Sequence, residues 1–381
     1  MSEIENTEVE DDTLSEGNPL LDIITINEIV KHENADTLSL ISPYGDGVNW
    51  AIAKTGTFQV GEKAIWIDSV NDPLVPVSNP LFAHMAKSAK ASGLARVKAM
   101  KLRGVKSRGL IIPFDPEWDG LTGNQIAKIL GIEKYKDPAI YGGGSGGSFQ
   151  TGNARSGPTH LLPTSKYDVE GLPKNWKMFR NGMKVTLTEK VHGANACFGY
   201  LPFEKQISED GTVSFKTEFF ARSRTLWKRP PTEDGKNMSL WWEVAKYHDL
   251  ETKLAPYPGI IVWGEAYGQV QDLKYNLDHA EFIAFDVWDT NTNRWFTWTE
   301  VVEFCKTIGI NHVPVIAEVE WNSEKGIPKD IIDMSEGTTL LNEARHVREG
   351  IVIRWDGDNG RRAILKLVGT GYLTRKSQPD T

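Results

Sequence analysis

Residues 187–200 read LTEKVHGANACFGY, and they place a cluster of polar residues between two apolar runs. Residues 183–188 alternate between apolar and polar side chains, which predicts a half-buried strand. An apolar pattern resumes at Cys197. Four polar residues and the glycine that bends the chain lie between the runs: Glu189, Lys190, His192, Asn195 and Gly193. The pattern fits either a solvated turn or a turn that points polar groups at a ligand.

The length and the cysteine content bound the class of protein. A chain of 381 residues predicts one large domain or two ordinary ones. Cys197 and Cys305 are the two cysteines, which is too few for a disulfide framework and indicates a reducing compartment. The N-terminus shows no signal-peptide pattern, and no apolar run reaches the length of a membrane span. We therefore expect a cytoplasmic protein that is not embedded in a membrane.

The net charge of −8 is unevenly distributed along the chain. Residues 1–20 contain seven acidic residues and no basic one, so the rest of the chain is nearly neutral. Residues 82–110 contain eight basic residues and no acidic one. Such a basic strip is either a solvated surface or a site for phosphates, so the acidic total does not exclude nucleic acid.

The composition predicts an α+β protein with two folded domains. Residues 1–20 are typical of a disordered acidic tail. Residues 21–135 contain short strands such as EKAIWIDSV and GLIIPF, which predict a small β-barrel of the OB type. Residues 136–160 include a Gly/Ser-rich run that predicts a flexible linker. Residues 161–381 mix apolar strands with helices, one of them capped by Thr299, which favours an antiparallel sheet with a cleft.

Charged residues recur beside apolar strands in the second half of the chain. The stretches are FFARSRTLWK at 219–228, IVWGEAYG at 261–268, EFIAFDVW at 281–288, REGIVIRW at 348–355 and AILKLVG at 363–369. A single charge of this kind is usually an ordinary salt bridge, because an unpaired buried charge is costly. Several in series indicate one polar cleft. The Trp-rich run SLWWEV is more typical of a core than of a base-stacking surface.

EKVHGAN at 189–195 and these five stretches resemble, in order, nucleotidyltransferase motifs I, Ia, III, IIIa, IV and V of the covalent ligase and capping-enzyme superfamily. The histidine of the Lys-x-His-Gly pattern points to the ATP-dependent RNA ligases. The N-terminal stretches ADTLSLI, GEKAIWIDSV and RVKAMKLRGVKSRGLIIPF resemble the OB-type domain of the branch typified by the Deinococcus and Naegleria enzymes. The resemblance covers about residues 22–375 and implies an ATP-grasp-like adenylyltransferase domain after the barrel.

The resemblance also implies roles for individual residues. Lys190 would form a lysyl–AMP intermediate, with His192, Glu349 and Lys366 as its catalytic companions. The remaining nucleotide contacts would come from Glu189, Asn195, Arg224, Glu265 and Phe285. Glu349 and Glu265 would hold Mg²⁺ or Mn²⁺. RNA would be contacted by Lys98, Lys101, Arg103 and Lys106, and by Arg222 as the less favoured register for motif Ia.

The implied reaction joins RNA 3′-OH and 5′-phosphate ends at the expense of ATP. The implied substrate is RNA with a nick or bridged break, either a duplex RNA or one with DNA on one strand, and the implied assembly is a monomer. Ala194 stands where the family often has Thr or Ser, and a single lysine stands in motif V. The alternatives are a DNA ligase or capping enzyme, which the missing C-terminal OB domain disfavours, a catalytically silent RNA-end-binding protein, and an OB-type tRNA or single-strand binder.

Overall fold

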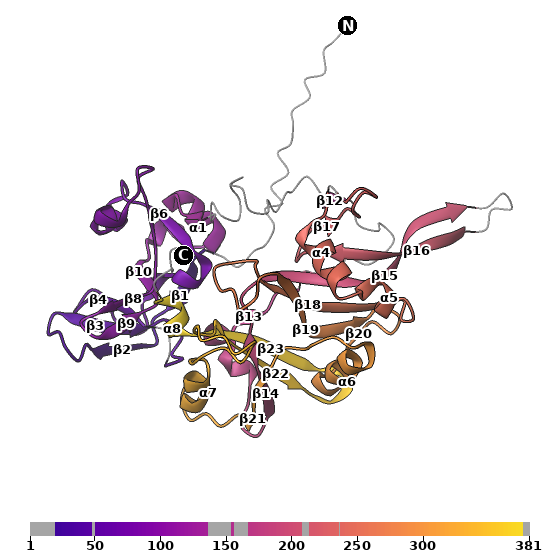
Figure 1. Ribbon diagram of the computed structural model, residues 1–381. Coiled ribbons are helices and arrows are strands. Elements are labelled where there is room, and N and C mark those ends of the chain that lie inside the picture. Colours follow the sequence, from indigo (N-terminus) through magenta and orange to yellow (C-terminus); the bar gives the residue numbers. More distant parts are fainter. Residues whose placement is uncertain are drawn as a thin grey trace, which may run out of the picture. The chain divides into compact units, whose positions relative to one another are not determined.

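The computed structural model describes residues 20–47, 50–135, 154–155, 167–207, 213–235 and 237–375 (Figure 1). The chain divides into two compact units. The first contains Met1–Pro43 and Trp50–Tyr135, and the second contains Tyr44–Asn49 and Lys136–Thr381. The predicted acidic tail, up to residue 19, and most of the predicted linker lie outside the described residues. Within that linker, Ala154–Arg155 forms strand β12, so this part of the expectation is corrected.

The first unit consists of short antiparallel strands. Three of its sheets have three strands each, in the orders β1-β5-β10, β2-β3-β4 and β11-β6-β7, and β8 pairs with β9 as a hairpin. The strands are β1 (Asp22–Thr25), β2 (Glu28–Lys31), β3 (Leu38–Ser42), β4 (Ala51–Lys54), β5 (Lys63–Asp68), β6 (Pro73–Pro76), β7 (Leu94–Arg96), β8 (Met100–Leu102), β9 (Val105–Ser107), β10 (Gly109–Pro113) and β11 (Glu133–Lys134). Among the described residues these sheets do not close into one barrel, so the OB-type assignment stays a prediction.

The core of the first unit forms where its most apolar strand lies between two others. The central strand β5 buries Ala64, Ile65, Trp66 and Ile67 completely. Helix α1 (Gly123–Leu130) packs onto this core through Ile126, Ala127 and Leu130. It begins at a capping box, in which the Thr122 hydroxyl and the Gln125 side chain each accept the other's backbone N–H. Three 3₁₀ helices complete the unit: η1 (Ser69–Asn71), η2 (Pro80–Ser88) and η3 (Pro116–Trp118).

The second unit contains two larger sheets, which are antiparallel except for one parallel pair. One has the order β12-β17-β16-β15-β18-β19-β20, and the other has the order β13-β23-β22-β14-β21. The strands are β13 (Glu170–Gly171), β14 (Lys184–Lys190), β15 (Ala194–Ile207), β16 (Val213–Arg222), β17 (Trp227–Lys228), β18 (Ile260–Gly268), β19 (Ala280–Asp289), β20 (Arg294–Trp295), β21 (Val315–Glu320), β22 (Gly350–Asp356) and β23 (Arg362–Val368). The prediction of an α+β fold built on antiparallel sheets is confirmed.

The described part of the second unit also contains α-helices and 3₁₀ helices, and several of them pack on its sheets. These helices are α3 (Leu172–Asn175), η5 (Trp176–Met178), α4 (Leu240–Tyr247), α5 (Leu250–Leu254), α6 (Trp298–Ile308), α7 (Lys329–Met334), η6 (Asp358–Gly360) and α8 (Thr370–Leu373). Helix α4 buries Trp241 and Trp242, which confirms that the Trp-rich run belongs to the core. Helix α6 begins two residues earlier than predicted, because Thr297 and Glu300 form its capping box, so Thr299 is not the cap. Among the described residues, no helix is both long and apolar enough to cross a bilayer.

Candidate active site

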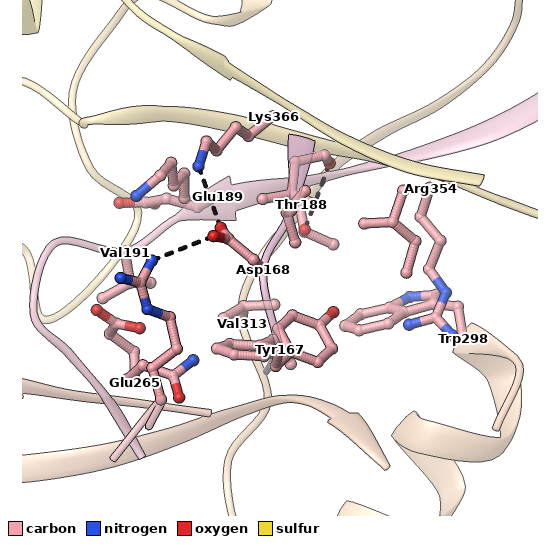
Figure 2. Close-up of a pocket in the computed structure, with 17 residues that line it drawn as sticks. Tyr167, Asp168, Thr188, Glu189, Val191, Glu265, Trp298, Val313, Arg354 and Lys366 are labelled. Atoms are coloured by element: carbon pink, nitrogen blue, oxygen red, sulfur yellow. Dashed lines mark hydrogen bonds and ion pairs between the residues drawn. The ribbon is translucent and has the colours of Figure 1, made fainter. Parts of the chain in front are cut away.

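A pocket of about 830 Å³, measured out to open solvent, lies between the two sheets of the second unit (Figure 2). One wall is a face of the β23-β22-β14 sheet. The register aligns Thr188 of β14 with Val352 of β22, and Val352 with Lys366 of β23. Alternate residues of a strand share one face, so Lys190 points to the same side as Thr188. Two lysines from different strands therefore line the same wall.

The other wall comes from the larger sheet and carries Asn195, Glu265 and Phe285. Asn195 of β15 lies directly opposite Glu265 of β18, so their side chains are neighbours. The register between β18 and β19 shifts at Trp263/Gly264 and leaves Phe285 without an opposite residue. Such a β-bulge re-aims a side chain, which accounts for Phe285 facing the pocket beside the fully buried Asp286.

The polar cluster predicted as one turn is divided between a strand and a turn. Strand β14 continues through Glu189 and Lys190, and β15 begins at Ala194, so the connection is only residues 191–193. A Cβ atom at Gly193 would lie 2.1 Å from the carbonyl oxygen of Ala266. Glycine at this position therefore lets the chain cross from one sheet to the other against β18.

Lys190 forms an ion pair with Glu349. Its Nζ lies 2.6 Å from Glu349 Oε1, and both side chains are mostly buried. Burial alone would lower the pKa of Lys190, but the Glu349 and Glu265 carboxylates outweigh it and raise that pKa. Burial likewise opposes the charged form of Glu349, but Lys190 lowers the pKa of Glu349 to about 2. The carboxylates therefore favour the protonated form of the Lys190 amine in this structure.

Glu265 is a carboxyl in a different electrostatic setting. Burial raises the pKa of Glu265 to about 8, so its charged form is disfavoured compared with that of an exposed carboxyl. The Oδ1 atom of Asn195, its cross-strand neighbour, is buried without a hydrogen-bond partner. Asn195 and Glu265 line the pocket, and Glu349 is linked to it through its ion pair with Lys190.

A divalent cation fits this donor set only with help from a substrate. Among the described residues, no cluster of three or more His, Cys, Asp or Glu side chains forms a ready metal cage. Mg²⁺ is commonly held by one or two carboxylates together with substrate phosphates and water. Glu349, Glu265 and the unpartnered Asn195 oxygen match that pattern.

His192 does not line the pocket but lies behind Glu349. Its Nε2 lies 2.7 Å from Asp272 Oδ1, and its Nδ1 lies 2.9 Å from the Tyr372 hydroxyl and 3.3 Å from Glu349 Oε2. Burial disfavours the charged ring, but the hydrogen bonds with Asp272 and Glu349 raise the pKa of His192. His192 therefore positions Glu349 rather than facing the pocket. Sequence reasoning missed Asp272 and Tyr372, which no motif marked.

Arg224 and Lys366 share one carboxylate. Asp168 Oδ2 lies 3.2 Å from Arg224 Nη1, and Asp168 Oδ1 lies 3.7 Å from Lys366 Nζ (Figure 2). Burial lowers the pKa of Lys366, and nearby Lys190 lowers it further. Asp168 was not predicted, since it follows a low-complexity segment and has no sequence signature.

Two other predicted residues are held by the protein itself. Glu189 lines the pocket, but its Oε1 accepts from the Thr339 hydroxyl (2.5 Å) and its Oε2 from the Leu340 amide (2.8 Å). Arg222 is only 3% exposed and stacks on Trp227 and Trp263. The expectation that Arg222 contacts nucleic acid is therefore corrected, because its guanidinium lies in the core.

The four cations predicted to bind RNA from the first unit are all exposed. Lys101 of β8 lies directly opposite Lys106 of β9. Arg103 lies in the tight turn of this hairpin, and Lys98 precedes it. Their exposure leaves the RNA-binding prediction open.

The strands that form the pocket lie in a region similar to a known protein family. The RNA ligase family model matches residues 183–368, from just before β14 to the end of β23. The match covers 186 of the 381 residues, just under half of the chain. The family resemblance drawn from the ordered motifs is thereby confirmed. The search of curated proteins found no significant match.

The fold extends this likeness to nearly the whole chain. Naegleria gruberi RNA ligase with PPi is 22% identical, with a TM-score of 0.71 over 94% of this chain and 98% of that one. A mutant of that ligase with ATP and Mn, and another with AMP and Mn, are each 22% identical with a TM-score of 0.70, covering 93% and 98% of the two chains. At this identity the structures establish a shared fold.

Proposed function

We propose that this protein is an ATP-dependent RNA ligase that joins 3′-OH and 5′-phosphate ends. The observation that carries the proposal is the position of Lys190. Its amine lies on the wall of a pocket that also presents Glu265, Phe285 and Lys366, each from a different strand. A nucleophile, a second cation and an aromatic ring around one cavity suit nucleotidyl transfer to lysine.

The proposed reaction has three balanced steps. The Lys190 amine attacks the α-phosphorus of ATP, and pyrophosphate leaves as the lysyl–AMP bond forms. The RNA 5′-phosphate then takes AMP from Lys190. The RNA 3′-OH finally attacks this activated phosphate and releases AMP. Phe285 is proposed to contact adenine, Asn195 and Glu265 the nucleotide, and Arg224 and Lys366 its phosphates or the RNA 5′-phosphate.

The charge state of Lys190 sets a condition on the first step. An amine titrating near its ordinary pKa of about 10.4 is largely protonated at pH 7, which handicaps attack by roughly 4 kcal/mol. In this structure Glu349 strengthens that protonation. Mg²⁺ or Mn²⁺, when bound at Glu349 and Glu265, supplies positive charge near the phosphates. Glu349 must share or release its contact with Lys190 for the amine to lose its proton.

The first unit is proposed to bind the RNA as an OB-type domain. Its exposed cations on and beside the β8–β9 hairpin suit a phosphate backbone, which gives affinity without sequence preference. The proposed substrate is a nick or bridged break, in duplex RNA or with DNA on one strand, handled by a monomer. A cytoplasmic location stays a prediction from the cysteine content.

The test of this function is transfer of label from [α-³²P]ATP to the chain in Mg²⁺ or Mn²⁺, read on a denaturing gel. Wild type should be labelled with ATP and not with GTP, and Lys190→Ala should not be labelled. Sealing of nicked RNA should follow, with nicked DNA as the comparison. Intact mass of the starting protein identifies any chain already carrying AMP. An unmodified wild-type chain that takes no label with either metal would refute the proposal.

A further inference from the structure

Asp168 lines the pocket beside two cations. An acidic residue is unexpected at this place, because a phosphate-binding site usually offers cations. Asp168 lies between Arg224 and Lys366, which approach its two carboxylate oxygens at 3.2 Å and 3.7 Å. Among the described residues, neither cation forms an ion pair with any other carboxylate within 4 Å. The two cations proposed to bind phosphate therefore already share one internal anion.

Contacts of the residues before and after Asp168 fix its position. After it, strand β13 pairs in parallel with β23, with Gly171 opposite Lys366. Before it, the Tyr167 hydroxyl donates to Asp286 at 2.8 Å. The Tyr167 ring also packs against Phe285, with centroids 4.9 Å apart. The residues on both sides of Asp168 are therefore held in place, which restricts the position of the Asp168 side chain.

The carboxylate resembles a phosphate oxygen pair in charge and in the donors that it satisfies. Arginine and lysine bind carboxylate and phosphate by the same charge-assisted hydrogen bonds. An incoming polyphosphate that contacts Arg224 and Lys366 must therefore replace Asp168 or share the cations with it. The carboxylate also repels a phosphate brought close to it.

We propose that Asp168 is an internal competitor for phosphate, which occupies Arg224 and Lys366 before nucleotide binds and yields them when it does. This inference rests on the proposed function of the pocket. Its consequence is that Asp168 weakens nucleotide binding in exchange for keeping the two cations paired in the empty protein. Removing its charge should strengthen the binding of phosphates.

The test is calorimetric binding of inorganic pyrophosphate to the full-length chain, whose freedom from AMP is first checked by intact mass. Asp168→Asn keeps the size of the side chain and removes its charge. Glu170→Gln is the matched control. It removes the same charge two positions along the chain, and the Glu170 side chain is exposed and forms no ion pair with either cation. Asp168→Ser repeats the charge removal in case the asparagine variant does not fold, and melting temperatures verify folding.

We expect Asp168→Asn to bind pyrophosphate about tenfold more tightly than wild type, equivalent to about 1.4 kcal/mol. Glu170→Gln should stay within about twofold of wild type. In self-adenylylation, Asp168→Asn should lower the KM for ATP. Unchanged or weaker pyrophosphate binding by both Asp168 variants overturns the inference and leaves the proposed function intact. A wild-type chain that binds neither pyrophosphate nor ATP overturns both.

Discussion

The fully buried carboxylate of Asp286 allows a quantitative prediction about stability. It accepts from the Arg354 guanidinium at 3.3 Å, from the Arg362 guanidinium at 2.5 and 3.2 Å, and from the Tyr167 hydroxyl at 2.8 Å. Arg354 is 4% exposed. Asp286→Asn would leave two largely buried cations facing a neutral amide. Removing one partner of a buried ion pair costs about 3–5 kcal/mol, because the other charge stays buried and unpaired.

The lower end of that range applies here, since Arg354 keeps a second carboxylate. Its Nε lies 2.9 Å from Asp356 Oδ2. We therefore expect Asp286→Asn to reduce the free energy of unfolding by about 3 kcal/mol, measured by urea titration of the full chain with circular dichroism and fluorescence. Adding Arg362→Gln should recover part of the loss, because it removes one of the uncompensated charges.

An exposed aspartate provides the control for Asp286→Asn. The Asp278 side chain is 98% exposed and pairs with neighbouring His279, so Asp278→Asn should change the free energy of unfolding by less than about 0.5 kcal/mol. If Asp286→Asn loses less than about 1 kcal/mol, the network is not what holds the two sheets together at this end of the pocket. A double variant less stable than Asp286→Asn alone would refute the charge argument in the same way.

Three further predictions concern other parts of the molecule. Gly193→Ala should abolish self-adenylylation and lower the melting temperature, because its Cβ would lie 2.1 Å from a carbonyl oxygen; an active variant would contradict the close crossing. Burial raises the pKa of Cys305 to about 12 and that of Cys197 further, so neither thiol should react with a thiol reagent at pH 8 until the protein unfolds; rapid labelling of the native chain would contradict the burial. Replacing Lys101 and Lys106 by Gln should weaken RNA binding and reduce the slope of log affinity against log salt by about 1.4 to 1.8, with self-adenylylation unchanged; an unchanged slope would exclude this hairpin from the RNA interface.

The charged pocket residues that lie on strands were the most predictable part of the site. Lys190, Glu265 and Lys366 each interrupt an apolar strand with a charge, and such an interruption is visible in a sequence because it is costly unless used or paired. The structure brings all three to one pocket. Their order along the chain then specified the family. The pairing of strands, which decides that the three side chains meet, does not follow from periodicity.

The ends of helices, the exposure of individual side chains and the directions of pKa shifts were less predictable, because they depend on neighbours that the sequence does not identify. Thr297 and Thr299 are both acceptable helix caps by residue type, and only the position of Glu300 favours the first. Arg222 and Arg224 are separated by one residue, and both suit motif Ia by residue type. Arg222 is buried because aromatic rings pack on it, whereas Arg224 is more exposed. The raised pKa of Lys190 could not be predicted for the same reason, since it depends on how close Glu349 lies.

The residues that sequence reasoning missed act through partners distant in the chain. Asp168 has meaning only beside Arg224 and Lys366, which are 56 and 198 positions away. Asp272 and Tyr372 matter because both meet the ring of His192. None of them interrupts an apolar pattern, so none carries a local cost that the sequence would reveal. A polar residue in a loop is inexpensive wherever it points, and only the fold determines whether it points at solvent or at a catalytic group.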